Sequence, residues 1–423
     1  MRQYPAVALE RAMKVQEVYM RAMAKKITGL QAAEILGVTD RTMRWKRHFE
    51  KVGYVVDRRW GRKSEKKTPV EMIEKVLGLY RDHYFDFSVR HFHEKLVTEH
   101  YIQLSYTWVK KALQASGLVA KTRDRRVHRK KRPRRPIPGM LLHIDGSHHQ
   151  WFQDDRWYDL LVILDDATSE VYYAALVQDE STRTVMAALR EVIQHHGLFC
   201  ALYSDRASHF FFTPKAQQAV DHRQLTQVGR AMKELGIQMI PAYSPQARGR
   251  SERNFRTWQG RLPQELRLHN ITTLEAANRF LRDAYIPQFN TSFTFKPAQS
   301  GTAFVPVGPM NLDRIFSIQH ERTVNGDNTV RLANMILQIP PTLWRSTLAG
   351  CRVLVLEQLD GTLTITYGPH TVGRYHDDGR PILDPPKPKR ERPSKQKKEL
   401  ALQKVGANSF ENKVTSAARS SPR

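Results

Sequence analysis

Between residues 140 and 262, short apolar runs alternate with longer amphipathic segments, and this alternation constrains the fold of the chain. The expected strands are 140–144, 157–165, 171–177, 199–204 and 237–241, and the expected helices are 181–196, in which Ser181 is the cap, 223–235 and 247–262. Runs of four to eight apolar residues favour buried strands, and the longer periodic segments favour helices. The order βββαβαβα predicts a mixed α/β sheet with helices on both faces.

Three acidic residues occupy related places in this pattern. Asp145 and Asp205 each come directly after an expected strand, and Glu252 lies in the first turns of the last expected helix. Carboxylates that follow strands lie at the edge of a sheet, where sites are commonly built. If the first and fourth strands are neighbours, the two aspartates come together, and the helix can bring Glu252 in from the side.

Three carboxylates are suitable ligands for Mg²⁺ or Mn²⁺, which are hard cations that prefer oxygen. Two such ions, about 4 Å apart, can activate an attacking water or 3′-hydroxyl and stabilise the leaving 3′-oxygen of a phosphodiester. The expected cofactor is therefore two Mg²⁺ or Mn²⁺ ions, with Asp145, Asp205 and Glu252 as the catalytic, metal-binding residues.

The sequence around these acids resembles the integrase-core transposases of bacterial insertion sequences, which are DDE-type relatives of retroviral integrase with an RNase H-like fold. The matching stretches are LHIDGSHHQWF, YDLLVILDDATS, YSDRASHF and AYSPQARGRSER. The last is the most specific, because in that family Ser-Pro and a basic, Gly-containing turn lead into the helix with the catalytic glutamate. The resemblance covers roughly residues 20–380, and the layout is most similar to the ISNCY group.

The chain departs from this family in two respects. Asp205 and Glu252 are 47 residues apart, more than in the shortest members, and the stretch 209–215 is the expected insertion. Many relatives also have a basic residue two helical turns after the glutamate, where this chain has Gln259. Arg256 lies one turn after Glu252 on nearly the same face and could substitute.

Other polar residues compete for roles near Asp145. Asp165 and Asp166 end the second expected strand, and the resemblance implies that they are structural. A zinc site is not expected, because neither cysteine, Cys200 nor Cys351, is near these residues in sequence. A role in orienting a phosphate or the nucleophile stays open for one of the histidines that flank Asp145, which are His143, His148 and His149.

Residues 22–53 have the pattern of a helix-turn-helix. Gly37 suits a tight turn with positive φ, and Thr39 or Asp40 can cap the second helix. The polar face of that helix is basic and would enter the major groove of DNA. The residues expected to contact DNA there are Arg44, Arg47 and Lys51.

A second helical unit and a basic linker follow. Helices are expected at about 69–84, 88–99 and 105–116, with Ser88 and Ser105 as caps and Gly117 closing the last one. This resembles another DNA-binding unit, and whether it carries a wing stays open. Ten of the fifteen residues from 121 to 135 are Lys or Arg. Such a linker can lie along phosphates, through Arg129, Lys130 and Lys131 among others.

The C-terminal part is strand-rich and ends in a basic tail. Asn325-Gly326 and Asp360-Gly361 are typical of hairpin turns between alternating runs, which predicts a small β-barrel. The tail is rich in Pro, Lys, Arg and Ser, a composition that predicts disorder. The expected organisation is a helix-turn-helix unit (1–66), a second helical unit (67–120), a basic linker (121–138), the integrase-like core (139–310), the β-barrel (320–380) and the tail (381–423).

The charge of the chain favours a polyanionic partner. It has 68 Lys and Arg against 42 Asp and Glu, a formal net charge of +26, and nucleic acid is the commonest partner of such chains. No apolar run of 18 residues and no secretory signal are found, so we expect no membrane partner. The expected location is the bacterial cytoplasm, in association with the nucleoid.

These features together predict a DNA transposase. The helical units would bind the inverted repeats at the element's ends, and the core would cleave one strand and direct the 3′-hydroxyl at target DNA. A homo-multimer assembled on double-stranded DNA is expected, and Arg248, Arg250 and Arg256 would grip DNA near the cut. The alternatives are a catalytically silent repressor derived from a transposase and a nuclease acting on RNA–DNA hybrids.

Overall fold

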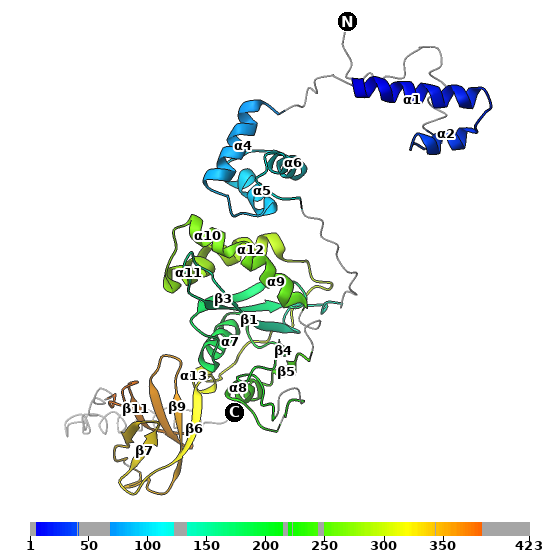
Figure 1. The fold of residues 1–423 in the computed structure, drawn as a ribbon. Coiled ribbons are helices and arrows are strands. Elements are labelled where there is room, and N and C mark those ends of the chain that lie inside the picture. Colours follow the sequence, from blue (N-terminus) through cyan, green and yellow to red (C-terminus); the bar gives the residue numbers. More distant parts are fainter. Residues whose placement is uncertain are drawn as a thin grey trace, which may run out of the picture. The chain divides into compact units, whose positions relative to one another are not determined.

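The computed structural model describes residues 6–39, 41, 68–121, 133–214, 219–221, 223–243, 249–342 and 344–382. The chain divides into two units (Figure 1). The first comprises residues 1–85 and 107–120, and the second comprises residues 86–106 and 121–423.

The first unit contains helices α1 (Ala6–Met23), α2 (Gly29–Ile35), α4 (Val70–Asp82) and most of α6 (Tyr106–Ala115). Thr28 and Gln31 form a capping box at the start of α2. Gly37 follows that helix with φ of +63°, which confirms the predicted turn. The second helix of the predicted helix-turn-helix, with Arg44, Arg47 and Lys51, lies outside the described residues.

Helix α5 (Val89–Thr98) begins the second unit. Ser88 caps it as predicted, with its hydroxyl accepting a hydrogen bond from the His91 N–H. The described residues 68–121 contain helices and no strand, so no wing is found there. The linker residues Arg129, Lys130 and Lys131 lie outside the described ranges.

The centre of the second unit is a five-stranded mixed sheet of order β3-β2-β1-β4-β5. Its strands are β1 (Leu142–His149), β2 (Tyr158–Asp165), β3 (Val171–Val177), β4 (Ala201–Ser204) and β5 (Gln238–Pro241). β1, β2 and β3 are antiparallel neighbours, whereas β4 is parallel to both β1 and β5. This sheet fits the predicted RNase H-like core.

Helices cover both faces of this sheet, as the sequence predicts (Figure 1). On one face, α7 (Thr182–His196) and α8 (Gln227–Glu234) pack on alternate residues of the strands, such as Ile144 of β1 and Ile163 of β2. On the other face, Leu160 and Val162 of β2 pack against α9 (Gly249–Gln259), α10 (Leu262–Leu268), α11 (Leu274–Phe280), the π-helical turn Leu281–Tyr285 and α12 (Ile286–Phe293).

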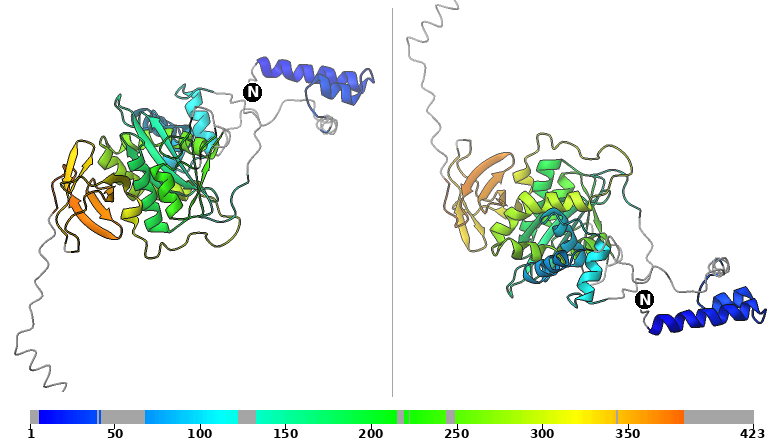
Figure 2. Two further views of the ribbon diagram at one scale, coloured as in Figure 1. Left: turned by 90° about the horizontal axis from the view of Figure 1, so that it is seen from below. Right: turned by 90° about the horizontal axis from the view of Figure 1, so that it is seen from above.

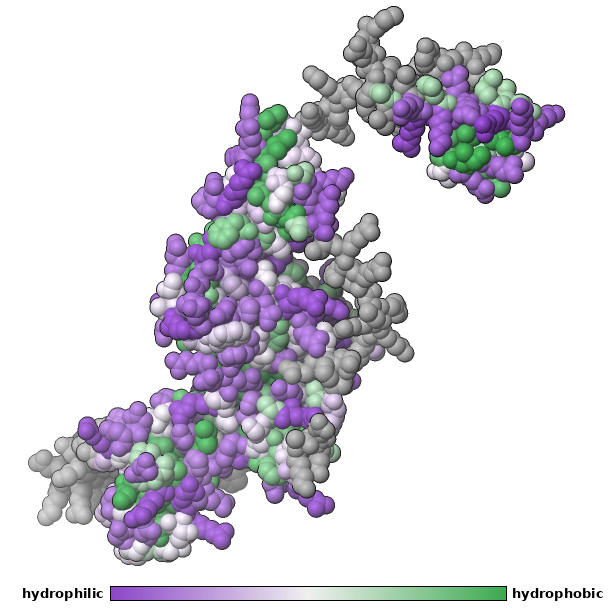
Figure 3. All heavy atoms as spheres, in the orientation of Figure 1, coloured by the Kyte–Doolittle hydropathy of each residue, from purple (hydrophilic) through white to green (hydrophobic). Residues whose placement is uncertain are grey.

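The outer sides of these helices are polar. Figure 3 shows a mainly hydrophilic surface over α10, α11 and α12. Their inner sides bury large residues, among them Trp258 of α9, Leu266 of α10 and Phe289 of α12. This amphipathic pattern is what fixes the helices on the sheet, because burial of one apolar face is the main source of helix stability in a domain.

Helix α5 is joined to α10 by a buried ionic network. Lys95 Nζ donates to Glu265 Oε2 at 2.8 Å, and His91 Nε2 lies 2.6 Å from Glu265 Oε1. Burial would raise the pKa of Glu265, but the hydrogen bond from His91 and the charge of Lys95 outweigh it and lower this pKa. Two half-exposed pairs, Arg261–Glu94 and Arg267–Asp86, flank the network.

The C-terminal part forms two small sheets. One has the order β11-β10-β9-β6, from β6 (Ile318–Thr323), β9 (Arg352–Glu357), β10 (Leu363–Tyr367) and β11 (His370–Tyr375). The other pairs β7 (Thr329–Leu332) with β8 (Met335–Gln338). Both views of Figure 2 show these orange and yellow strands apart from the central sheet.

The predicted β-barrel is not confirmed, because these sheets pack around one apolar cluster without closing. Asp360-Gly361 does join two paired strands, β9 and β10, as predicted. Asn325-Gly326 instead connects β6 to β7, which belong to different sheets. The helix α13 (Leu312–Ile315) precedes β6, and the predicted tail from residue 383 on lies outside the described residues.

Candidate active site

Asp145 lies on β1, and Asp205 directly follows β4, the parallel neighbour of β1. In the β1–β4 pairing, Leu142 is opposite Leu202 and His143 is opposite Tyr203. The same register, continued by two residues, sets Asp145 opposite Asp205. The prediction that Asp145 ends its strand is wrong, because β1 continues to His149 through its pairing with β2.

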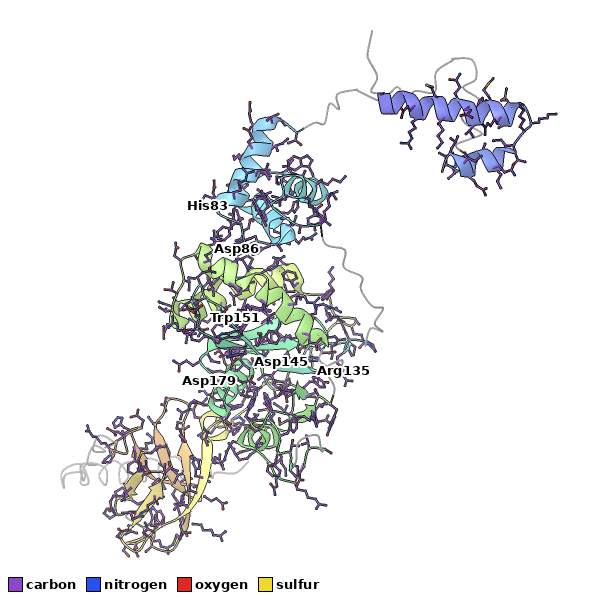
Figure 4. The ribbon with its side chains drawn as sticks, in the orientation of Figure 1. His83, Asp86, Arg135, Asp145, Trp151 and Asp179 are labelled. Carbon is purple, nitrogen blue, oxygen red and sulfur yellow. The ribbon has the colours of Figure 1, made fainter. Side chains whose placement is uncertain are left out.

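The alternation of side chains decides which face Asp145 occupies. Leu142 and Ile144 point into the core under α7 and α8. Asp145 and Ser147 therefore point to the opposite face, where α9 lies (Figure 4). Asp145 is 7% exposed, and Asp205 is of intermediate exposure.

Helix α9 is fixed over β1 at both of its ends. Near its start, the Arg250 guanidinium pairs with Asp166, which also contacts His143 of β1. At its end, Gln259 Nε2 donates to Ser147 Oγ at 3.0 Å. The helix thus runs along β1 in the same direction, from the level of His143 to that of Ser147.

These two anchors bracket Glu252. It precedes Gln259 by seven residues, which is close to two helical turns, so both side chains project from the same side of α9. Glu252 is exposed at the N-terminal end of the helix. The stretch of β1 between the two anchors is the one that carries Asp145.

The donor set suits a hard divalent cation, because it consists of carboxylate oxygens. Among the residues that the structure describes, however, no group of three or more His, Cys, Asp or Glu side chains is close enough to hold a metal ion. The register of β1 and β4, if continued, would set Asp145 opposite Asp205, but within the described residues the two do not form such a group with Glu252.

Asp165 holds backbone in place. Its carboxylate is fully buried and accepts hydrogen bonds from the N–H groups of Ala167, Thr168 and Gly139, at 2.7 to 2.9 Å. This closes the turn between β2 and β3, in the structural role that the resemblance implies.

Asp166 is equally buried and joins three segments. It accepts from the Arg135 N–H at 2.8 Å, contacts His143 Nε2 at 2.7 Å and pairs with Arg250. Burial would raise the pKa of Asp166, but the hydrogen bonds from His143, Arg135 and Arg250 outweigh it and hold this pKa far below its usual range. The carboxylate is therefore committed to charged and polar partners in the fold.

The histidines near Asp145 have partners of their own. His143 is buried against Asp166 and Tyr203. His148 Nδ1 lies 2.8 Å from Asp159 Oδ1, and its ring stacks on Trp157. Burial lowers the pKa of His149. The hydrogen bonds of His143 and His148 tie them to the sheet, which does not favour a direct role on substrate.

The predicted DNA contacts near the cut differ in their surroundings. Arg256 is exposed on α9, whereas Arg250 is engaged with Asp166 and with the Pro133 carbonyl. Arg248 lies outside the described residues.

No pattern in the sequence singles out Glu180, which lies against Gly146, the residue after Asp145. A Cβ atom added at Gly146 would overlap the Glu180 carboxylate, so this carboxylate lies against the backbone next to Asp145. Glu180 also pairs with His209, four residues after Asp205. The one available signal was the glycine itself, because a strand glycine often marks a close approach.

Comparison with known proteins identifies transposases as relatives. The chain is 29% identical over 371 residues to a putative transposase of Sinorhizobium fredii, covering 86% of this chain and 80% of that protein. It is 28% identical over 338 residues to the transposase for insertion sequence IS1202 of Streptococcus pneumoniae, covering 71% and 72% respectively. No family model matches.

Solved structures with partial likeness are retroviral integrases. The catalytic core domain of HTLV-2 integrase in complex with magnesium aligns with 35% of this chain and 89% of its own, at 17% identity and a TM-score of 0.25. A simian T-cell lymphotropic virus intasome with a PP2A regulatory subunit aligns with 73% and 99%, at 13% identity and a TM-score of 0.30. These scores are too low to carry an inference about this chain.

The sequence likeness defines the class: the chain is similar, over most of its length, to insertion-sequence transposases, and its central sheet fits an integrase-like core. The resemblance predicted from the sequence is thereby confirmed. Within the described ranges, no helix is long and apolar enough to cross a membrane.

Proposed function

We propose that this protein is a DDE-type DNA transposase that cleaves the ends of its own element and joins them to target DNA. Asp145, Asp205 and Glu252 are its proposed catalytic residues. The observation that carries the proposal is the register of β1 and β4, which pairs Leu142 with Leu202 and His143 with Tyr203, so that its continuation by two residues would set Asp145 opposite Asp205. The transposase relatives support the reaction class.

In the proposed mechanism, Asp145, Asp205 and Glu252 would hold two Mg²⁺ or Mn²⁺ ions. When bound, these ions supply charge stabilisation for the attacking and leaving oxygens of an in-line displacement. Strand β1 carries Asp145, the turn after β4 carries Asp205, and the first turn of α9 carries Glu252, which is exposed.

The same site can serve both steps. Cleavage uses water as the nucleophile, and joining uses the 3′-hydroxyl that cleavage releases. Each step breaks one P–O bond and forms another, so neither needs a covalent enzyme intermediate. Two DNA ends have to be joined together, and we therefore propose a homo-multimer assembled on double-stranded DNA in the bacterial nucleoid.

The proposed DNA contacts follow from charge. The N-terminal helical units would bind the inverted repeats through Arg44, Arg47 and Lys51, and the linker residues Arg129, Lys130 and Lys131 would lie along phosphates. Near the cut, Arg256 is exposed on the same helix as Glu252. Arg248 precedes that helix, and Arg250 would have to leave Asp166 to reach DNA.

The test uses purified full chain, labelled duplex that matches the inverted repeats flanking the gene, and Mg²⁺ or Mn²⁺. We expect nicking at the repeat end and joined products, both abolished by chelation of the metal. Asp145→Asn and Glu252→Gln should remove both products and retain duplex binding. Asp154→Asn, which removes a partly exposed acid paired with Arg156, is the matched control and should leave both products unchanged.

Two outcomes would contradict the proposal. Tight duplex binding by the wild type without nicking in either metal would indicate a DNA-binding repressor. Cleavage of RNA–DNA hybrid but not of the repeat duplex would indicate a hybrid nuclease.

A further inference from the structure

The ladder between β1 and β4 ends before it reaches the candidate site. Only Leu142–Leu202 and His143–Tyr203 form the ladder between these strands. The ladder therefore stops two residues before Asp145 and Asp205. Hydrogen bonds of the sheet alone do not fix the separation of the two carboxylates, so another connection has to do so.

The side chain of Glu180 lies at this point, on the face of the sheet opposite to Asp145. Gly146 is at an even position of β1, like Leu142 and Ile144, which face α7. A Cβ atom on Gly146 would overlap Glu180 Oε2. The Glu180 carboxylate thus occupies the space that a side chain at residue 146 would take, directly against the backbone that carries Asp145.

The backbone of Glu180 is anchored to the antiparallel part of the sheet. Its N–H donates to Asp159 Oδ2 at 2.7 Å, and the other oxygen of Asp159 contacts His148 of β1. Glu180 immediately precedes Ser181, the N-cap of α7, where the helix dipole favours a carboxylate. Figure 4 labels Asp145 and Asp179, which are the sequence neighbours of Gly146 and Glu180.

The other end of the connection is the turn after β4. His209 Nε2 lies 2.9 Å from Glu180 Oε1, and the two side chains are only 13% and 21% exposed. Within this turn, the Ala207 N–H donates to Asp205 Oδ1 at 3.0 Å, and Phe210 N–H donates to the Ala207 carbonyl. Phe210 is buried in the core under α7 and α8, so His209 belongs to a turn that is fixed on both sides.

We infer that Glu180 and His209 are positioning residues that bridge β1 to the turn after β4 and set the separation of Asp145 and Asp205. The inference rests on the proposed function, because it assigns the bridge to that site. The pair acts through the backbone at Gly146 and through the turn that contains His209. The pair connects the two segments beyond the last residue pair of the β1–β4 ladder.

The expected consequence concerns ion binding. Mg²⁺ requires near-ideal octahedral geometry, so carboxylates whose spacing varies should bind it poorly. Loss of a group that orients metal ligands commonly reduces metal affinity by about 10–100-fold. We expect the same range for Glu180→Gln, with a smaller loss for Mn²⁺ than for Mg²⁺.

The experiment has two readouts on full-length variants, and neither depends on DNA cleavage. The first is hydrogen exchange of the backbone amides of residues 144–148 and 205–210. The second is Mn²⁺ affinity, from the electron paramagnetic resonance signal of the free ion, with Mg²⁺ as competitor. The variants are Glu180→Gln, His209→Gln and the double variant, and thermal unfolding checks that each is folded.

We expect faster exchange in both segments and weaker ion binding in each single variant, with no further loss in the double variant because one bridge is broken in all three. Gly146→Ala should reproduce the effect by displacing the Glu180 carboxylate while keeping both partners. Asp313→Asn, which breaks the Arg190–Asp313 pair at the outer side of α7, is the matched control and should change neither readout.

Three results would overturn the inference. They are unchanged exchange in both segments, additive losses in the double variant, or faster exchange with unchanged ion affinity. If the Asp145→Asn variant binds Mn²⁺ as tightly as the wild type does, the proposed metal site itself is wrong. Failure of the proposed function can thus be told apart from failure of this inference, because the comparison of these two proteins involves no change at Glu180.

Discussion

At the scale of single residues, neighbouring acids in this core do different work because their surroundings differ. Asp145 lies on the face of β1 that α9 covers, whereas Asp166 is buried among His143, Arg250 and the Arg135 backbone. A buried carboxylate with several charged partners stays ionised, and removing it leaves those partners uncompensated. Asp166 therefore contributes to the stability of the fold, although it lies close to the candidate site.

The pH dependence of stability should report on Asp166. Its pKa in the folded chain is lowered from 3.8, so the unfolded chain takes up the proton first as the pH falls. The stabilisation is present above about pH 4 and is lost below it. Asp166→Asn should lower the free energy of unfolding by about 3 kcal/mol near neutral pH and weaken the acid dependence.

Urea unfolding followed by tryptophan fluorescence between pH 3 and pH 6 measures both effects. Asp154→Asn, which changes a partly exposed acid, is the control and should follow the wild type. Parallel curves for wild type and Asp166→Asn would show that Asp166 contributes nothing to the acid dependence.

At the scale of elements, helix α7 illustrates how a local signal fixes a boundary. Ser181 Oγ accepts from the Thr184 N–H at 3.2 Å, and Thr184 Oγ1 accepts from the Ser181 N–H at 2.8 Å. This reciprocal cap starts the helix at Thr182, as the sequence predicts, and it follows directly after Glu180. The cap therefore also fixes the backbone from which Glu180 reaches Gly146.

Removing this cap should destabilise the core. We expect Ser181→Ala to lower the free energy of unfolding by about 1 kcal/mol, the usual cost of losing such a cap. Ser181→Asn should recover most of that loss, because asparagine caps about as well as serine. Chemical denaturation of the wild type and the two variants measures the free energy of unfolding. Equal values for all three would mean that the capping hydrogen bonds contribute nothing to stability.

At the scale of the whole molecule, residues that are far apart in sequence are joined by buried charge. Glu265 of α10 contacts Lys95 and His91 of α5, and its side chain is 3% exposed. Helix α5 comes before the basic linker, and α10 follows the helix that carries Glu252. The network therefore ties α5 to the helical layer that also contains α9.

Breaking this network should cost far more than breaking its exposed branch. We expect Glu265→Gln to lower the free energy of unfolding of the second unit by about 3 kcal/mol, because it leaves Lys95 buried without its main partner. Glu99→Gln removes another partner of Lys95, but Glu99 is 42% exposed, so the cost should be below about 1 kcal/mol. Thermal unfolding of both variants measures the difference, and similar losses would contradict the buried role.

The sequence alone indicated the five strands of the central sheet and the helices α7, α8 and α9, because their signals are local. Apolar periodicity marked these strands and helices, Ser88 and Ser181 marked helix starts, and Gly37 marked a turn. The motifs around Asp145 and Asp205 likewise indicated the class to which the relatives belong.

Tertiary structure decided what depends on contacts between distant segments. Pairing with β2 extended β1 beyond Asp145, and the C-terminal strands formed two separate sheets. Packing of α9 on the sheet buried Asp166 against Arg250. It also brought Glu180 against Gly146 and joined it to His209, across 29 residues of sequence. Such contacts leave no periodic trace in the sequence, because they depend on how separate elements pack and not on the conformation of any one of them.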